Sequence, residues 1–414
     1  MNRRSRFTAP GRLFLVLLAA LAIEGQARVA EVLSRHLPAE PIVRRSDLLR
    51  EQTKEIALML DTTRAIRDAL DPELGWRYKA GYSTSTDHLN AQGLRALHVY
   101  DSLPRPGVLR VAVFGDSFAY GNEVEDDNTW CSIVESTTND IEVLNYGVGG
   151  YGLDQAFLRF QREGMKLRPD VVIIVFVPDD PPRVLNVYRR FMSAREWPLS
   201  KPRFALQRDG TLQLIPNPLP SRDALVELMR HPEEVRSLGS RDAWYSPTVY
   251  ENPLYDHLAT VRVASTVWRW FDRGFLDPNR LIRNGVFNEQ SPAFPLEVAI
   301  ITRFAAVVRG RGVTPIILLL PDKRSVKSVH DGNETVYEPL RSTLVRRGLT
   351  VWDGIDAFRS TEMSVDRLFA PYLHYSALGN GVLAQWLRQK LEPLGDARRT
   401  SWRSAMRATQ SSGG

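Results

Sequence analysis

The sequence predicts an α/β protein built on a parallel sheet with helices on both faces. Three observations indicate this class. From residue 108 onward, short apolar segments with the composition of strands alternate with segments of helical periodicity. Two of these strands, at 109–114 and 171–177, are apolar throughout, as expected for strands that are covered on both faces. Glycine or polar residues follow directly after the strands. Right-handed crossovers would bring all of these strand ends to one edge of the sheet.

The alternation gives the expected elements in order. The strand at 109–114 precedes a helix near 129–137, a strand at 141–146, a helix at about 153–166 and the strand at 171–177. The last of these is the most apolar and is therefore expected at the centre of the sheet. The alternation stops after residue 180. It resumes with a helix at 295–309, strands at 313–320 and near 349–352, and a last helix at about 376–391.

These boundaries divide the chain into six expected parts. Residues 1–27 form a signal anchor or signal peptide, and residues 28–107 a helical stalk followed by an extended lead-in. The sheet domain occupies 108–180 and 295–395, interrupted by an inserted and mainly helical subdomain at 181–294. Residues 396–414 are polar and are expected to be disordered. The insertion is rich in tryptophan, and we expect most of these side chains to pack in its interior: Trp197, Trp244, Trp268 and Trp270.

The N-terminus carries a targeting signal. An apolar run at 13–23 follows four arginines: Arg3, Arg4, Arg6 and Arg12. The run is shorter than the roughly 20 residues of a spanning helix, and its basic flank favours retention of this end in the cytoplasm. An uncleaved signal anchor is the first interpretation. A cleaved signal peptide is the alternative, with Ala20-Leu21-Ala22 as the cleavage site. A soluble amphipathic helix is disfavoured because the run is apolar on every face. Either export signal places the main domain in the periplasm.

Composition excludes several classes of function. The formal net charge is +6, but arginine is spread along the chain rather than gathered in a stripe, so no nucleic-acid partner is expected. A single cysteine, Cys131, excludes an internal disulfide. It lies in the helical pattern after the first strand and is expected to be a buried structural thiol.

The first strand leads into Gly115-Asp116-Ser117, a tight turn with a serine at the edge where α/β sheets bind ligands. Glycine at this turn allows backbone conformations that other residues avoid. A serine hydroxyl is a weak nucleophile until a base accepts its proton. Taken alone, Asp-Ser after a strand is more often the N-cap of a helix than a catalytic site.

Three further segments follow strands or precede the last helix. Residues 145–152 are glycine-rich, so their backbone N–H groups can approach a ligand or an oxyanion; their spacing is not that of a dinucleotide loop. Asp179 and Asp180 follow the central strand, where two acids bind a metal or face solvent. His374 lies just before the last helix, with Ser376 as a candidate N-cap.

The order of these segments resembles the SGNH/GDSL hydrolase superfamily, in its membrane-anchored bacterial type. Residues 114–118 are similar to the first family block, 145–150 to the second and 374–379 to the fifth, and Asp179-Asp180 stands where the third block has Asn-Asp. Asn90-Ala-Gln-Gly93-Leu-Arg95 and Gly121-Asn-Glu-Val124 with 127–130 also resemble segments that flank the nucleophile. The resemblance covers roughly 70–395 apart from the insertion.

The resemblance implies a flavodoxin-like three-layer fold and a serine esterase without a cofactor. Carried over by position, Ser117 is the nucleophile and His374 its base. The backbone N–H groups of Ser117 and Gly150 form the oxyanion hole, and the residue at 179 adds a third donor. Position 179 is here an aspartate, and an ionised carboxylate cannot donate.

The family's helper acid usually lies two or three residues before the histidine. Pro371 and Tyr372 occupy those positions here. Asp366 is the nearest candidate for this role, and Asp353 or Asp356 could reach from the preceding strand.

Three hypotheses follow. The first is an exported, membrane-tethered serine esterase or acyl hydrolase, acting on an O-acetylated glycan or a small acyl ester; transfer of the acyl group to another sugar would use the same acyl-enzyme. The second is a degenerate member that binds a glycan or a protein without turnover. The third, a metal-dependent phosphoesterase, requires more ligands than the three strand-end acids and one histidine. The separation between Ser117 Oγ and the His374 ring discriminates the first two.

Overall fold

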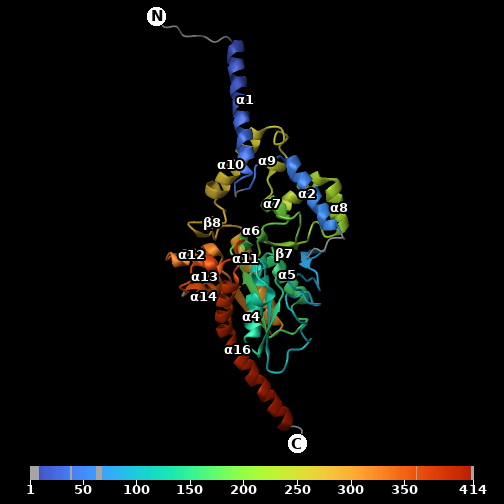
Figure 1. Ribbon diagram of the computed structural model, residues 1–414, viewed down its shortest axis with the longest axis vertical. Helices are drawn as coiled ribbons and strands as arrows, with labels where there is room; N and C mark the ends of the chain where they lie inside the picture. Colours follow the sequence, from blue (N-terminus) through green and yellow to red (C-terminus); the bar gives the residue numbers. More distant parts are fainter. Residues whose placement is uncertain (1–8, 38–39, 62–67, 360, 412–414) are drawn as a thin grey trace. The chain divides into compact units, whose positions relative to one another are not determined.

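The computed structural model describes residues 9–37, 40–61, 68–359 and 361–411 (Figure 1). The chain forms two compact units, each made of segments that are distant in sequence. The sheet unit comprises Ala65–Leu185, Ser200–Ser221 and Leu281–Gly414. The N-terminal unit comprises Met1–Arg64, Asn186–Leu199 and Arg222–Arg280.

The sheet unit is built on five parallel strands in the order β11-β10-β5-β3-β4. Their bounds are β3 Leu109–Phe114, β4 Ile141–Asn145, β5 Val171–Phe176, β10 Thr314–Leu319 and β11 Val351–Asp353. Counted along the chain, this is the 2-1-3-4-5 order of flavodoxin-like sheets. The predicted α/β class with a parallel sheet is therefore confirmed, and β5 is central as predicted.

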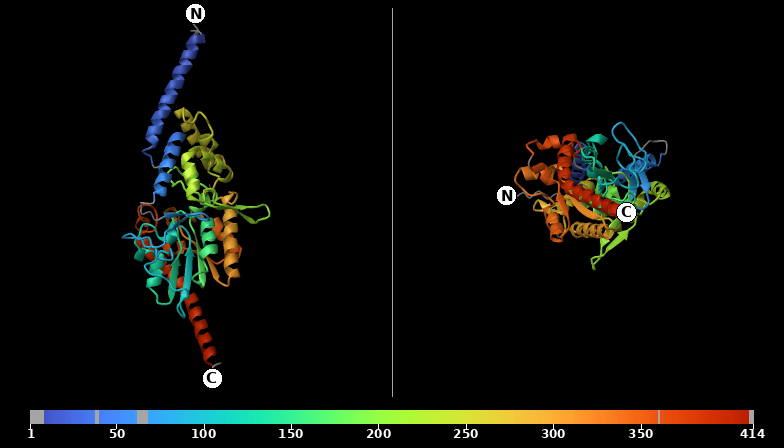
Figure 2. Two further views of the ribbon diagram at one scale, coloured as in Figure 1. Left: turned by 90° about the vertical axis from the view of Figure 1, so that its right-hand side faces the viewer. Right: turned by 90° about the horizontal axis from the view of Figure 1, so that it is seen from below.

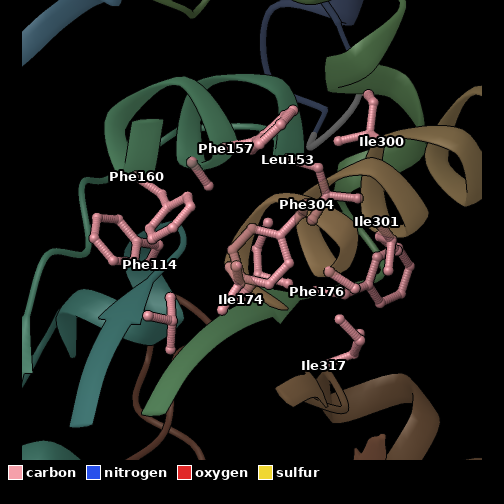
Figure 3. Close-up of a cluster of buried hydrophobic side chains, with 14 of the residues drawn as sticks. Phe114, Leu153, Phe157, Phe160, Ile174, Phe176, Ile300, Ile301, Phe304 and Ile317 are labelled. Carbon is pink, nitrogen blue, oxygen red and sulfur yellow. The ribbon is translucent and has the colours of Figure 1, made fainter. Parts of the chain in front are cut away.

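Helices cover both faces of the sheet. Alternate residues of β3 and β5 point to opposite faces, so Phe114 and Ile174 join one buried cluster while Val113 and Ile173 join the other. Helices α5 (Leu153–Glu163), α11 (Ala293–Gly310) and α13 (Glu338–Arg346) contribute to the first cluster. Figure 3 shows the phenylalanine rings of this cluster packed between strands and helices. On the other face lie α4 (Trp130–Ser136), α12 (Lys323–His330), α14 (Ile355–Arg359), α15 (Val365–Leu368) and α16 (Ala377–Ser411).

Short elements complete the sheet unit. Three antiparallel hairpins are present in its described part: β1 Asp68–Asp71 with β2 Gly75–Tyr78, β6 Arg203–Leu206 with β7 Leu212–Ile215, and β8 Ile282–Arg283 with β9 Val286–Phe287. Short helices follow two of the sheet strands and include α3 Ser117–Tyr120, η1 Asp126–Asn128 and α6 Asp180–Val184. Because they begin at strand ends, α3 and α6 place polar side chains at one edge of the sheet.

The N-terminal unit is helical. Its elements are α1 Ala9–Ser34, α2 Arg45–Leu60, α7 Arg189–Met192, α8 Arg222–Arg230, η2 Pro232–Arg241, α9 Pro247–Tyr250, α10 Ala259–Phe271 and the π-helical turn η3 Asp272–Leu276. Its segments are joined by buried polar contacts: Tyr188 donates its hydroxyl proton to Gln52, and the Asp242 carboxylate accepts from Asn186 and two backbone N–H groups. Within α1, Leu13–Ser34 is long and apolar enough to cross a membrane, as a signal anchor or a signal peptide would be.

Three details differ from the sequence-based expectations. Residues 181–294 do not form one body: the β6–β7 segment groups with the sheet, because Phe204 packs on Phe157 and Lys201 forms a buried ion pair with Asp154. The stretch from 396 is not disordered up to Ser411, because α16 continues there and projects from the sheet unit (Figure 2). Most of the insertion's tryptophans are not packed inside: Trp197, Trp268 and Trp270 are more than half exposed.

Candidate active site

The turn after β3 places Ser117 at the first residue of α3. A Cβ atom at Gly115 would lie 2.7 Å from Cβ of Val175 and 2.8 Å from Cβ of Ala119, so close packing requires glycine here. Its φ is not positive, so the close packing, and not a left-handed backbone conformation, accounts for glycine at this position. Asp116 is the N-cap of α3 and accepts the N–H of Phe118 at 2.9 Å. The capping interpretation thus holds for Asp116, and the adjacent serine side chain remains available for another partner.

That partner is His374. Ser117 Oγ lies 2.8 Å from His374 Nε2, although the two residues are 257 positions apart in the chain. His374 lies in the loop that precedes α16, where Ser376 accepts the N–H of Gly379 as the predicted N-cap. The ring of Phe118 packs against the imidazole, with ring centroids 5.0 Å apart. The structure therefore brings the predicted nucleophile and base within hydrogen-bond reach.

The acid beside His374 is Glu123. Its carboxylate lies 2.6 Å from His374 Nδ1 and also accepts the backbone N–H groups of His374 at 3.0 Å and Tyr372 at 2.7 Å. With a carboxylate at Nδ1, the imidazole proton resides on that nitrogen, which leaves Nε2 as an acceptor for the serine hydroxyl. Ser117, His374 and Glu123 thus have the connectivity of a catalytic triad.

The backbone on both sides of this contact is strained. Glu123 has φ 70° and Leu373 has φ 84°, a region that non-glycine residues rarely adopt. Such strain persists only where surrounding contacts fix it, and it is common at active sites. Here the three hydrogen bonds to the Glu123 carboxylate hold both turns in place.

The environment of Glu123 keeps it ionised. Burial by itself would raise the pKa of this carboxyl group, but the N–H groups of His374 and Tyr372 and the imidazole contact outweigh it and lower the pKa below its usual value. An ionised acid at this position can stabilise the imidazolium that forms when His374 accepts a proton.

None of the acids expected from the sequence contacts His374. Asp366 is the correction that matters most: its side chain is 86% exposed and pairs with Lys323 at 2.7 Å. Asp353 accepts the Tyr337 hydroxyl proton and the Ile355 N–H, and its burial raises its pKa to about 6. Asp356 is exposed, with Arg359 as its ion-pair partner.

Glu123 was not predicted from the sequence, because the family resemblance places the helper acid two or three residues before the histidine. Glu123 follows the nucleophile by six residues, just beyond α3, within the segment Gly121-Asn-Glu-Val124. Gly121 ends the helix with φ 86°, and the N–H of Asn122 donates to the Ser117 carbonyl at 3.0 Å. The tight turn at Gly121 keeps the chain beside the nucleophile, and this glycine was the sequence feature that could have indicated an acid at position 123.

The acids after β5 surround a buried arginine. Arg183 donates to Asp116 at 2.7 Å and to the Tyr151 carbonyl at 3.1 Å, and it pairs with Asp179 at 3.4 Å. Burial alone would lower the pKa of Arg183, but the neighbouring acids Asp116, Asp179 and Asp180 raise it, so the guanidinium stays charged. Asp179 is the N-cap residue of α6, and its side chain is 67% exposed.

Asp180 behaves differently from Asp179. It is buried and accepts the Val177 N–H at 2.9 Å. Burial, together with the charges of Asp116 and Asp179, raises the pKa of Asp180 well above its usual value, although Arg183 acts in the opposite direction. The two adjacent acids therefore have separate environments: Asp180 is buried and accepts a backbone N–H, whereas Asp179 is exposed and pairs with Arg183.

The glycine-rich loop after β4 is held against other parts of the sheet unit. A Cβ at Gly147 would lie 2.3 Å from the Tyr120 backbone nitrogen, so the loop passes directly over α3. The Gly149 N–H donates to the Tyr78 hydroxyl at 2.7 Å, and Gly150 has φ 77°. Participation of the Gly150 N–H in an oxyanion hole stays a prediction.

Structural comparisons find solved structures that are similar to this chain at low TM-scores. Similar solved structures include a member of the lipolytic G-D-S-L family from Veillonella parvula (10% identity, TM-score 0.32, covering 67% of this chain and 95% of that one). A lipase/acylhydrolase from Enterococcus faecalis gives 11% identity and a TM-score of 0.33, with coverage of 69% and 96%. A catalytic mutant of an acetylxylan esterase from Geobacillus stearothermophilus gives 11% and 0.34, with coverage of 68% and 94%.

No family model matches the chain, and no curated protein matches it significantly. At such identities the chemistry has to be argued from the geometry of the site.

No metal centre is present among the described residues, which contain no group of three or more His, Cys, Asp or Glu side chains arranged to hold an ion. The acids at the strand ends already have a cation, because the Arg183 guanidinium lies between Asp116 and Asp179. The short contacts suited to proton transfer at this edge are those of Ser117, His374 and Glu123.

Proposed function

We propose that this protein is a serine esterase or acyl hydrolase that uses Ser117, His374 and Glu123. The observation that carries the proposal is the continuous path of two short contacts, 2.8 Å from Ser117 Oγ to Nε2 and 2.6 Å from Nδ1 to Glu123. A binding module needs neither contact, so this geometry favours catalysis over a degenerate fold.

The reaction has two halves. Ser117 Oγ attacks the ester carbonyl carbon while its proton passes to His374 Nε2. Collapse of the tetrahedral intermediate releases the alcohol, which takes that proton, and leaves an acyl group on Ser117. In the second half, His374 Nε2 accepts a proton from water, which attacks the acyl carbonyl carbon. Collapse of the second tetrahedral intermediate returns that proton to Ser117 Oγ and releases the carboxylic acid. Glu123 holds the imidazole by Nδ1 throughout and stabilises its charged form.

The oxyanion would be held by backbone donors. Ser117 is the first residue of α3, where a helix N–H has no acceptor within the helix. Gly150 would supply the second donor. Asp179 would not donate while it is ionised and paired with Arg183, but that pairing reduces its repulsion of a developing negative charge. The proposed hole thus relies on two backbone donors.

The substrate class and location are part of the proposal. The esters we favour are O-acetylated glycans or small acyl esters, and transfer to another sugar hydroxyl in place of water is the alternative outcome of the second half-reaction. The apolar helix α1 would tether the enzyme to the inner membrane, with the sheet unit in the periplasm.

A serine-reactive fluorophosphonate tests the proposal without knowledge of the substrate. We expect it to label the purified chain at Ser117, as mapped by mass spectrometry, and to abolish turnover of an activated acetyl ester. Ser117→Ala should remove both the labelling and the turnover while the chain remains folded. Labelling elsewhere, or unchanged turnover by Ser117→Ala, would exclude this nucleophile. A folded wild-type chain with neither property would favour the binding module.

A further inference from the structure

The end of α10 and the turn η3 expose an apolar surface that the esterase chemistry does not use. We call it the α10–η3 surface. Its side chains are between 43% and 67% exposed: Val267, Trp268, Trp270, Phe271, Phe275 and Leu276. Isolated exposed apolar residues are ordinary, but a contiguous group of this kind marks a contact with another surface.

These side chains lie at the C-terminal end of α10 and in η3, whereas the buried residues of α10, Ala259 and Arg262, lie in its first turn. The rings of Trp270 and Phe271 both pack on Phe275, with centroid separations of 5.5 Å and 5.6 Å. The aromatic rings therefore support one another and still face outward.

Helix α10 is fastened to the candidate membrane helix α1 of the same unit. The Glu24 carboxylate accepts the N–H groups of Ala259 at 2.9 Å and Thr260 at 3.0 Å, and also the Thr260 hydroxyl proton at 2.8 Å. About two turns further along α1, Glu31 pairs with Arg262. The start of α10 thus satisfies both carboxylates that interrupt the apolar sequence of α1.

These contacts matter because of the length of the apolar run. Residues 13–23 span only about 16 Å at about 1.5 Å per residue, roughly half of the ~30 Å hydrocarbon layer. The full candidate Leu13–Ser34 is long enough, but it includes the charged residues Glu24, Arg28 and Glu31. Charged groups at membrane depth persist when they are paired. Here Glu24 is paired with Arg28 of α1 and with the start of α10, and Glu31 with Arg262 of α10.

The apolar surface of α1 also continues beyond residue 23. Val29, Val32 and Leu33 are 56–59% exposed, while Ala27 and Ser34 are buried. Two exposed apolar surfaces, one on the C-terminal part of α1 and one on α10–η3, therefore belong to helices that are packed together.

We propose that the α10–η3 surface inserts into the non-cytoplasmic interface of the lipid bilayer beside α1. Tryptophan is enriched at this interface, and an amphipathic helix buries its apolar face there. The inference rests on α1 as the proposed anchor. It adds a second point of contact with the membrane for the N-terminal unit, beside α1.

Site-directed fluorescence in vesicles tests this inference. Trp270→Cys and Phe275→Cys in the full chain would each carry a fluorophore, because the native Cys131 is buried and should take no label. Val345→Cys, at a residue that is 50% exposed in the sheet unit, is the matched control, and Leu17→Cys reports on α1 itself. Retained labelling of Ser117 by fluorophosphonate shows that each variant is folded.

In vesicles of phosphatidylethanolamine and phosphatidylglycerol, brominated lipids should quench the labels at 270 and 275 several-fold more than the label at 345. Iodide in the water should quench only the label at 345. Quenching by iodide at 270 and 275 would overturn the inference, even if the label at 17 is in lipid and the anchor itself stands. Protection from both quenchers would also overturn it, since a protein partner or a second copy would then cover the surface.

Discussion

Replacement of Glu123 by glutamine tests the least expected feature of the site. The carboxylate accepts three hydrogen bonds, two at Oε2 from His374 and one at Oε1 from the Tyr372 N–H. Glutamine has the same shape but only one acceptor oxygen. Whichever way the amide is turned, its NH₂ group meets an N–H donor, and the negative charge that faces the imidazole is lost.

The expected loss follows from these contacts. A hydrogen bond to a charged group contributes about 1.5–3 kcal/mol, and about 1.36 kcal/mol changes a rate tenfold. Loss of the Nδ1 contact alone in the transition state would then lower kcat by roughly 10- to 150-fold. An imidazole with its proton on the wrong nitrogen costs more, about 10⁴ in the serine protease triad. We expect Glu123→Gln to lower kcat by about 10²–10⁴.

The assay is turnover of an activated acetyl ester, with kcat and KM measured separately, together with the rate of fluorophosphonate labelling at Ser117. Because Glu123 acts through His374 rather than on the substrate, kcat should fall while KM changes little. The matched control is Asp366→Asn, which removes the exposed ion pair with Lys323 and should leave both constants within about twofold.

Two results would refute the reasoning. Turnover by Glu123→Gln within about threefold of wild type would mean that the 2.6 Å contact does not orient the base. A large loss in Asp366→Asn would restore the acid expected from the sequence. The pKa of Glu123 adds an independent check: because it is lowered in the folded chain, the stability advantage of wild type over Glu123→Gln should be present near pH 7 and decline as the pH falls below about 4.5.

Three further predictions concern the surroundings of the site. Asp179→Asn should preserve or raise kcat, at most by the ~10²–10³ that one oxyanion donor supplies, and a large loss in steady-state assays would mean that Asp179 has a role of its own. Lys201→Met should destabilise the sheet unit by about 3–5 kcal/mol in urea unfolding, because the buried Asp154 carboxylate loses its partner; an unchanged midpoint would contradict this. Asp353 has a folded pKa of about 6 against 3.8, so wild-type stability should fall by up to ~3 kcal/mol as the pH rises from 4 to 7, and urea titrations of Asp353→Asn should lack that decline.

The sequence was informative where a local pattern dictates the structure. Apolar strands, their alternation with helices and right-handed crossovers predicted a parallel sheet with β5 at its centre and the strand ends at one edge, because segments that are apolar throughout must be covered on both faces. The pairing of Ser117 with His374 was also predictable, since each follows or precedes an element that ends at this edge.

The sequence did not determine which acid contacts His374, because several candidates fitted the pattern equally well. Asp353, Asp356 and Asp366 all preceded the histidine by short distances, and only the folded turns decide which acid can reach Nδ1. The positive φ of Leu373 turns the backbone of the loop towards Glu123, and that conformation cannot be read from residue types. The exposure of Trp268 and Trp270 could not be predicted either, because composition does not show which face of a helix packs against another element.

By itself, then, the sequence determined the α/β class and the central place of β5, because these follow from which segments must be buried. It also predicted that Ser117 and His374 meet at the edge where the strands end. The tertiary structure alone decided the acid, the pairing of Asp179 with Arg183 and the outward face of α10. Each of these depends on contacts between segments whose separation in the chain, 251 residues for Glu123 and His374, carries no information about distance in space.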